Sequence, residues 1–316
     1  GAGQEQRKIF EYACLAASEN GSPYFVFDRD EVTLSACCRL RTQIKDKYMI
    51  EHPESMRFCG FQNITINLPQ AAYRSGKGVM DRFFKEIADD MDLAVKAHLQ
   101  KKSFLEKLGS GKDSALYQII RNACDGRPYV DFEKSTYIIG MLGLNECVQH
   151  LTGKQLHDDE ETFRLGLKII SFMYLRAKDY EKKYNLKFSL EESPAESAAR
   201  RLAKVDLQKY PEAREVIKGN ISTDEYYYTN SIHFAANAPV SIIERVTKQS
   251  MFHSLIESGA IIHAFIGEEQ PNPASVFNFI EKVWRNTKAA QITISPEFTI
   301  CNDCNRTTRG LKEECR

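Results

Sequence analysis

The sequence predicts an α/β protein built on a parallel sheet, and two observations support this fold class. From residue 136 onward, short stretches with few charges alternate with longer stretches of helical periodicity. Strands of this largely uncharged composition are typical of parallel sheets that helices cover. At 316 residues, the chain can form one large domain or two ordinary ones.

The first part of the chain is less regular. We expect a helix over 4–18 and a short extended piece over 24–27. Residues 61–69 alternate in polarity and include several β-branched residues, which predicts a strand that ends at Pro69. Apolar residues recur every three or four positions over 79–99, and this spacing predicts an amphipathic helix of about six turns.

The segment 101–114 is polar and contains glycines, so we expect a loop there. Its Gly109-Ser110-Gly111-Lys112 lacks the full spacing of a phosphate-binding loop, and no apolar strand precedes it. Beyond this loop, we expect strands at 136–142, 186–190, 226–232, 261–266 and 291–300, and helices near 160–183, 194–205, 240–257 and 273–288.

The charge balance and hydropathy argue against two classes of partner. The 43 basic and 43 acidic residues leave no basic excess, so we expect no nucleic-acid partner. The longest apolar run, Tyr137 to Leu144, is far shorter than a membrane span and contains two glycines. The first four residues do not resemble a signal peptide and suggest a cut or artificial end, so we expect a cytoplasmic protein.

Nine cysteines in such a chain indicate a thiol site and a metal site rather than a disulfide framework. Cys37 and Cys38 are adjacent and are followed by Arg39 and Arg41. The structural alternative is a short helix start with two buried thiols, because free cysteine is commonly a small core residue.

Polar motifs follow two of the predicted strands. Gly143-Leu144-Asn145-Glu146 comes after strand 136–142, and Ser193-Pro194-Ala195-Glu196-Ser197 comes after strand 186–190. The carboxyl ends of parallel strands are where ligands gather, and helix amino ends bind phosphates there. The second motif also fits a capping box, with Ser193 as the N-cap and Glu196 as its partner. The structural and the phosphate-binding interpretations require the same geometry.

Two further features have bland alternatives. His233 ends predicted strand 226–232 and could be an acid or base, although a lone histidine is more often a hydrogen-bonded structural residue. Cys301 and Cys304 form a C-x-x-C motif that Cys315 follows, which predicts three of the four ligands of a zinc ribbon. A C-x-x-C pair can instead be a redox motif. The fourth ligand is expected at position 318, so we expect the chain to be truncated.

The ordered set of motifs resembles the catalytic subunit of anaerobic (class III) ribonucleotide reductases, which are glycyl-radical enzymes. The resemblance extends from about Ser22 to the end of the chain and rests on the segments 35–41, 63–69, 143–146, 192–197, 228–233 and 296–304. It implies that residues 1–295 form the second half of a ten-stranded α/β barrel, including a finger loop near Cys38. It implies that residues 296–316 begin a zinc-binding segment that leads to the radical glycine.

The same resemblance implies roles for individual residues. Cys38 is expected to form the thiyl radical, with Cys37 as its nearest rival and Cys147 as the fallback. Cys59 is a candidate redox-active cysteine or an ordinary strand-edge thiol. Substrate binding is expected from Asn145, Glu146, Ser193, Ala195, Glu196 and Ser197, and structural zinc binding from Cys301, Cys304 and Cys315.

The implied activity is the anaerobic reduction of ribonucleoside triphosphates to deoxyribonucleoside triphosphates. A radical S-adenosylmethionine activase would install the glycyl radical, nucleotide effectors would regulate the enzyme, and a homodimer is expected. The reductant is either formate or a small dithiol redox protein. Gly60 stands where many members carry a formate-positioning Asn, and this departure puts formate dependence in doubt. As an isolated fragment, the chain is expected to be inactive.

Two rival functions remain at this stage. The first is another glycyl-radical enzyme that acts on a non-nucleotide, against which the terminal cysteine cluster argues. The second is a non-catalytic zinc-ribbon module that binds nucleic acid, against which the balanced charge argues.

Overall fold

The computed structural model describes residues 3–29, 32–36, 39–121, 127–267, 270–296, 298–301, 303–310 and 312–314. The chain forms two compact units. The first consists of residues 1–29, 239–254 and 260–316, and the second of residues 30–238 and 255–259. The boundary expected at residue 295 stays a prediction.

The second unit is built on a parallel sheet of three strands in the order β4-β5-β6. These strands are β4 (Gly60–Asn67), β5 (Thr136–Leu142) and β6 (Lys187–Glu192). The register places Thr65 opposite Gly140, and Gly140 opposite Glu191. The predicted parallel arrangement is therefore confirmed for these strands.

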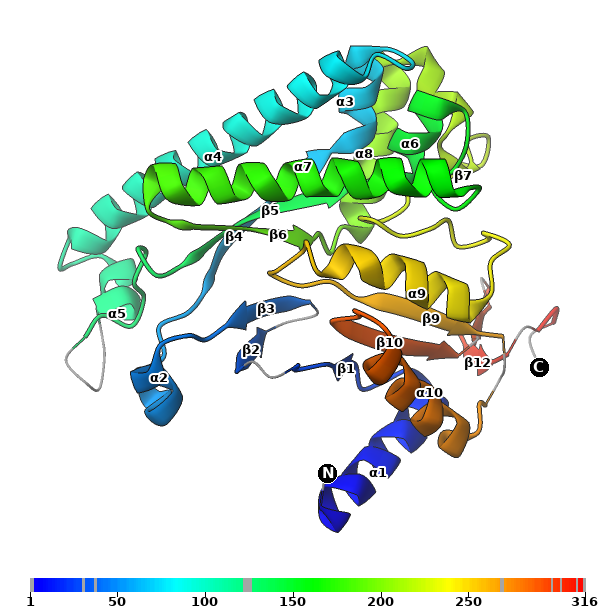
Figure 1. The fold of residues 1–316 in the computed structure, drawn as a ribbon, viewed down its shortest axis with the longest axis horizontal. Coiled ribbons are helices and arrows are strands. Elements are labelled where there is room, and N and C mark those ends of the chain that lie inside the picture. The colour runs from blue at the N-terminus through cyan, green and yellow to red at the C-terminus, as the bar shows by residue number, and fades with distance from the viewer. Residues whose placement is uncertain are drawn as a thin grey trace. The chain divides into compact units, whose positions relative to one another are not determined.

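Helices connect the strands of this unit. Between β4 and β5 lie α3 (Leu68–Ser75), α4 (Met80–Ser110) and α5 (Ala115–Arg121), and between β5 and β6 lie α6 (Leu144–Thr152) and α7 (Glu160–Tyr184). The long helices α4 and α7 run side by side over the sheet (Figure 1). Asp159 and Thr162 form a capping box that starts α7, and Asn185 ends it in the left-handed conformation.

The two faces of this sheet differ in chemistry because side chains alternate along each strand. Tyr137 and Phe188 belong to the apolar face, where both rings pack against His98 of α4. The opposite parity carries the polar side chains Asn63, Thr65, Ser189 and Glu191, with Gly140 between them. One face of the sheet is therefore a core, and the other can receive a polar ligand.

The remaining elements of this unit are short, apart from α8. They are the antiparallel pairs β2 (Thr33–Ala36) with β3 (Leu40–Gln43) and β7 (Lys218–Asn220) with β8 (Glu225–Tyr227), the helices α2 (Lys47–Glu51) and α8 (Glu196–Lys209), and the 3-10 turns η1 (Pro53–Ser55) and η2 (Pro211–Glu215).

The first unit has its own sheet, in the order β1-β10-β9. Its elements are α1 (Gln4–Asn20), β1 (Phe25–Val26), α9 (Ile242–His253), β9 (Ile262–Ile266), α10 (Pro273–Asn286), β10 (Gln291–Pro296) and the hairpin of β11 (Phe298–Ile300) with β12 (Thr307–Arg309). Strands β9 and β10 are parallel, and β1 pairs with β10 in the antiparallel sense. Ile262, Ile292 and Ile294 are fully buried in the core of this unit.

Three expectations about individual elements were wrong. The expected strand 226–232 extends only to Tyr227 and belongs to an antiparallel hairpin. The expected loop 101–114 is helical as far as Ser110, because Lys102 pairs with Glu106 one turn away and Gly109 packs against Ile120.

The third concerns the ends of strands. β4 ends at Asn67 because the Asn67 side chain caps α3, so Pro69 lies in the first turn of that helix. The expected strand 291–300 is divided into β10 and β11. The fold is mixed α/β, and the described strands do not show a closed barrel.

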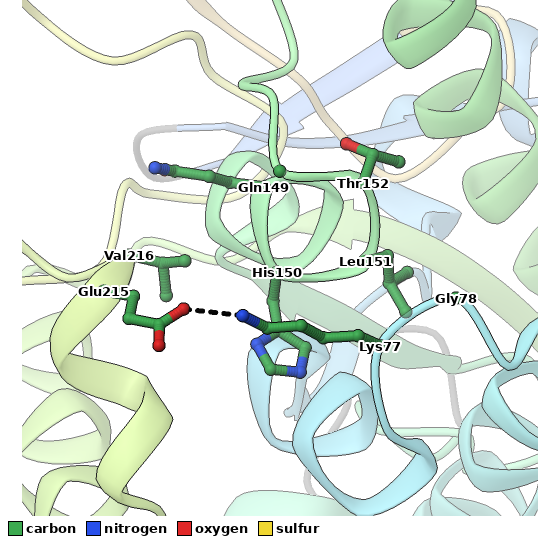
Figure 2. A pocket seen from close by; sticks show the side chains of 9 residues that line it. Lys77, Gly78, Gln149, His150, Leu151, Thr152, Glu215 and Val216 are labelled. Atoms are coloured by element: carbon green, nitrogen blue, oxygen red, sulfur yellow. Dashed lines mark hydrogen bonds and ion pairs between the residues drawn. The ribbon is translucent and has the colours of Figure 1, made fainter.

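A cavity of about 480 Å³ opens at the carboxyl ends of α3 and α6 (Figure 2). The Lys77 ammonium lies 2.7 Å from the Glu215 carboxylate across it. His150 is buried beside them, and neither of its ring nitrogens has a hydrogen-bond partner. Burial, together with the nearby Lys77, lowers the pKa of His150 and keeps it neutral. No residue expected to bind substrate or metal lines this cavity.

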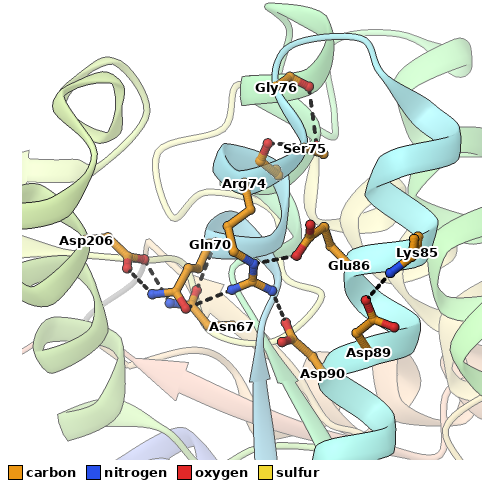
Figure 3. Close-up of polar contacts among 11 residues, drawn as sticks. Asn67, Gln70, Arg74, Ser75, Gly76, Lys85, Glu86, Asp89, Asp90 and Asp206 are labelled. Carbon is orange, nitrogen blue, oxygen red and sulfur yellow. Dashed lines mark hydrogen bonds and ion pairs between the residues drawn. The ribbon is translucent and has the colours of Figure 1, made fainter.

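Asp206 of α8 is fully buried and joins three elements of the second unit (Figure 3). Its carboxylate accepts hydrogen bonds from Asn67 at 2.8 Å and from Gln70 at 2.7 Å. The Tyr228 hydroxyl donates to it at 3.0 Å. Because Asn67 and Gln70 lie at the end of β4 and in α3, this carboxylate holds the end of the sheet against α8.

We predict that Asp206→Ala lowers the free energy of unfolding by about 3 kcal/mol, because three donors lose their buried acceptor. Asp89→Ala is the control, since Asp89 forms an exposed pair with Lys85 and should contribute less than about 1 kcal/mol. Urea denaturation followed by circular dichroism measures both. Equal losses in the two variants would contradict this role of Asp206.

In the described part of the chain, no helix is both long and apolar enough to span a membrane.

Candidate functional site

Ser193 lies at the centre of the polar groups at the carboxyl edge of the sheet. Its hydroxyl lies 2.7 Å from the Thr65 hydroxyl and 3.4 Å from the Asn63 amide oxygen. Its carbonyl accepts hydrogen bonds from Arg39 at 3.0 Å and from the Ser231 hydroxyl at 3.2 Å. The motif predicted from sequence is therefore tied to β4 and to two other segments.

The capping-box interpretation of this motif was wrong. Helix α8 begins at Glu196, its N-cap is Ala195, and no side chain caps it. Ser193 cannot cap the helix because its hydroxyl is held by Thr65 of β4. The first amides of α8 therefore have no capping side chain, which leaves the positive end of the helix dipole available to an anion.

Arg39 joins the β2–β3 hairpin to this motif. Its side chain is buried, with 4% of its surface exposed, and lies 3.9 Å from Glu192 and 3.7 Å from Glu196. Glu196 is 77% exposed, so its pairing with Arg39 faces solvent. A guanidinium among carboxylates and a backbone carbonyl fixes the position of the residue that carries it.

The backbone of the same hairpin is held on its other side. The Arg41 amide donates to the Ser258 carbonyl at 2.7 Å, and the Ser258 amide donates to the Leu190 carbonyl at 2.9 Å. A side chain at Gly259 would place its Cβ 1.7 Å from the Arg39 carbonyl oxygen. Only glycine fits so close to the hairpin backbone.

Glu191 and Glu192 are neighbours with different partners. Glu191 accepts a hydrogen bond of 2.6 Å from the Asn63 amide, and burial raises the pKa of Glu191 to about 7 although Asn63 and Arg39 oppose the shift. Glu192 lies 3.2 Å from the imidazole of His233, so His233 is bound to an acidic partner.

Asn145 and Glu146 lie in the first turn of α6, directly after Gly143. Glu146 is fully buried, and its carboxylate accepts from the Thr229 amide at 3.0 Å and from the Thr229 hydroxyl at 2.6 Å. The Asn145 oxygen accepts from the Leu156 amide at 3.1 Å. Burial raises the pKa of Glu146. Both side chains are thus directed at other parts of the protein, and Glu146 fixes the loop after β8.

The predicted thiols have separate locations. Cys37 and Cys38 lie outside the described residues. Cys59 lies directly before β4, with its sulfur 3.0 Å from the Ser135 hydroxyl, and therefore at the end of the strand opposite to the Ser193 motif. Cys147 is fully buried in α6, and burial raises the pKa of its thiol.

Among the expected site residues, Ser193 and Glu196 both contact Arg39, and Asn145 and Glu146 contact each other. Ala195 is buried as the N-cap of α8, and Ser197 is exposed in its first turn.

Sequence reasoning missed Asn63, Thr65 and Glu191 on the polar face of the sheet. Their signal was present, because polar residues occupy alternate positions in both β4 and β6. The contact of Arg39 with Ser193 has no sequence signal, since 154 positions separate the two residues.

The terminal cysteines Cys301 and Cys304 belong to the turn between β11 and β12. The Cys301 amide donates to the Arg306 carbonyl at 3.0 Å, and the Asn305 amide donates to the Cys301 carbonyl at 2.9 Å. Two thiols on one tight turn suit two adjacent ligands of a tetrahedral metal. Cys315 lies outside the described residues, among which no group of three potential ligands could hold a metal ion.

Together, the parallel strands, the uncapped helix and the ring of polar residues at the carboxyl edge define an α/β protein with a candidate polar ligand site. The family model described as "Anaerobic ribonucleoside-triphosphate reductase" matches residues 2–316. The chain belongs to this family, which confirms the resemblance found from the motifs.

Individual relatives agree with this assignment. The anaerobic ribonucleoside-triphosphate reductase of Haemophilus influenzae is 26% identical over 230 residues, which cover 70% of this chain and 31% of the relative. That of Enterobacteria phage T4 is 25% identical over 230 residues, which cover 70% of this chain and 35% of the relative. The chain therefore spans about a third of the length of these curated relatives.

Solved structures share the fold. A structure described as anaerobic ribonucleotide reductase has a TM-score of 0.62 at 19% identity, covering 80% of this chain and 37% of the other. The Thermotoga maritima anaerobic ribonucleotide reductase in complex with dATP and CTP has a TM-score of 0.59 at 19% identity, covering 80% of this chain and 39% of the other.

We predict that Gly259→Ala lowers the free energy of unfolding by about 2–3 kcal/mol, because the added methyl group meets the backbone of Arg39. Gly111→Ala serves as the control, since the nearest atom to its new Cβ is 4.0 Å away. Thermal denaturation of the two variants measures the difference. A Gly259→Ala variant as stable as the control would contradict the close packing of the hairpin.

Proposed function

We propose that this chain contributes to the active site of an anaerobic ribonucleoside-triphosphate reductase, which converts ribonucleoside triphosphates to deoxyribonucleoside triphosphates. The observation that carries this proposal is the bond from Arg39 to the Ser193 carbonyl. It ties the hairpin whose tip contains Cys38 in the sequence to the motif expected to bind substrate. The family supports the same reaction.

The substrate phosphates would lie at the amino end of α8. The first amides there lack a side-chain cap, and Ser197 is exposed in the first turn. Arg39 adds a positive charge close to this end of the helix. The ribose would then lie over the polar face of the sheet. Asn145 and Glu146 support this site through the loop after β8, because their polar atoms bind protein groups.

Cys38 is proposed as the residue that takes the 3′-hydrogen of the ribose as a thiyl radical, after which the 2′-hydroxyl leaves as water. A glycyl radical, installed by a radical S-adenosylmethionine activase, would supply the oxidising equivalent. Two electrons are needed for each product, from formate or from a small dithiol redox protein. Gly60 replaces the formate-positioning Asn, which favours the redox protein and leaves Cys59 as a candidate for exchange with it.

The larger assembly is part of the proposal. We infer that the two sheets belong to one ten-stranded barrel, that residues 296–316 begin a zinc-binding segment, and that the protein is a cytoplasmic homodimer. Nucleotide effectors are proposed by analogy with the Thermotoga maritima protein, whose structure was determined with dATP in its specificity site.

We predict that Cys38→Ser in the full-length gene product abolishes deoxynucleotide formation while the glycyl radical still forms, because serine cannot provide a thiyl radical. Anaerobic turnover of CTP and electron paramagnetic resonance measure the two properties. Cys37→Ser is the matched control and should remain active.

An inactive Cys37→Ser beside an active Cys38→Ser would move the thiyl assignment to Cys37. An activated wild-type protein that reduces no ribonucleoside triphosphate would contradict the proposed function itself.

We predict that the full-length protein binds about one zinc ion per chain and that Cys301→Ser with Cys304→Ser removes it, because two of four thiolate ligands are lost. Zinc analysis by inductively coupled plasma mass spectrometry tests this, with Cys59→Ser as the control. A double variant that retains its zinc would place the metal elsewhere.

A further inference from the structure

The row Thr65, Gly140 and Glu191 crosses the polar face of the β4–β5–β6 sheet. Glycine in the middle of this row leaves space that no side chain of β5 fills. A Cβ at Gly140 would lie 1.9 Å from the Ser193 hydroxyl and 2.4 Å from the Asn63 amide oxygen. The side chains of β4 and β6 therefore meet over the central strand and form one connected polar group.

Within this group, Glu191 is the ionisable member. Its partner Asn63 is a neutral amide that lies 2.6 Å away. Glu192 is held between His233 and Arg39, at 3.2 Å and 3.9 Å. Glu196 is largely exposed beside Arg39. Among these three carboxyl groups, Glu191 is the one that is both buried and free of a direct ion pair in the structure.

We propose that Glu191 is the acid–base group that transfers a proton between the hydroxyl groups of the substrate ribose, with Asn63 holding it in position. This inference rests on the proposed function. It adds a residue that neither the motifs nor the family comparison singled out.

The proton balance of the reaction calls for such a group. Once the 3′-hydrogen has been taken, the carbon–oxygen bond at C2′ breaks and the 3′-oxygen becomes a carbonyl. The carboxylate of Glu191 accepts the 3′-hydroxyl proton and passes a proton to the departing 2′-hydroxyl, which leaves as water. The unpaired electron moves from C3′ to C2′, so this step consumes no further oxidant or reductant.

The surroundings of Glu191 suit both halves of this transfer. Burial raises the pKa of Glu191 to about 7, Arg39 and the Asn63 hydrogen bond oppose the shift, and Glu192 adds to it. Both protonation states are then populated near neutral pH, which is the condition for an effective acid–base group. A carboxyl that was fully ionised would accept a proton but release it poorly.

The test is Glu191→Gln in the full-length, activated protein. Glutamine keeps the size of the side chain and an oxygen that can accept from Asn63, but it cannot ionise. We expect kcat to fall at least about 100-fold with KM changed little and with the glycyl-radical yield preserved. Glu257→Gln is the matched control, because it makes the same change in a carboxylate that pairs with Lys178 on the surface.

A second readout separates acid–base chemistry from a structural role. Infrared titration should show a carboxyl group that ionises near pH 7 in the wild type and is absent from Glu191→Gln. Glu191→Asp, which keeps the ionisation, should recover part of the activity with a shifted pH profile.

The outcomes distinguish this inference from the proposed function. A Glu191→Gln variant with wild-type kcat, or a wild type with no carboxyl titrating near pH 7, would overturn the role of Glu191 while leaving reductase activity in place. A wild-type protein without reductase activity would contradict both.

Discussion

The candidate site depends on the buried hydrogen bond from Arg39 to the Ser193 carbonyl. A guanidinium cannot lose its charge in a protein, so its burial requires acidic or carbonyl partners around it. Those partners are the Ser193 carbonyl, Glu192 and Glu196, all of which follow or end β6. One cation thereby orders the hairpin, the end of the strand and the start of α8 together.

The different faces of the sheet explain how this site and a stable core coexist. Tyr137 and Phe188 pack against α4 on one face, while Asn63 and Glu191 pair on the other. Glycine at position 140 allows the polar side chains from both neighbouring strands to approach one another. Buried carboxylates at Glu146 and Asp206 then hold the surrounding loops and helices by direct hydrogen bonds. A polar ligand surface is thus supported by rigid elements.

Sequence patterns predicted the regular elements well and their ends less well. Strand β5 was predicted at its observed bounds, because seven consecutive buried residues give an unambiguous signal. The cap of α8 was predicted wrongly because the hydroxyl of Ser193 is held by Thr65, which lies 128 positions earlier in the chain. Local sequence cannot reveal a competing partner so far away. For the same reason, the motifs located the substrate loops but not the Arg39 contact or the Asn63–Glu191 pair.

The most direct test of this account is the structure of the full-length protein with a bound ribonucleoside triphosphate. The account predicts phosphates at the amino end of α8 and the ribose over the row Thr65, Gly140 and Glu191. A nucleotide bound instead in the cavity beside Lys77 and His150, with the polar face of the sheet left uncontacted, would contradict it.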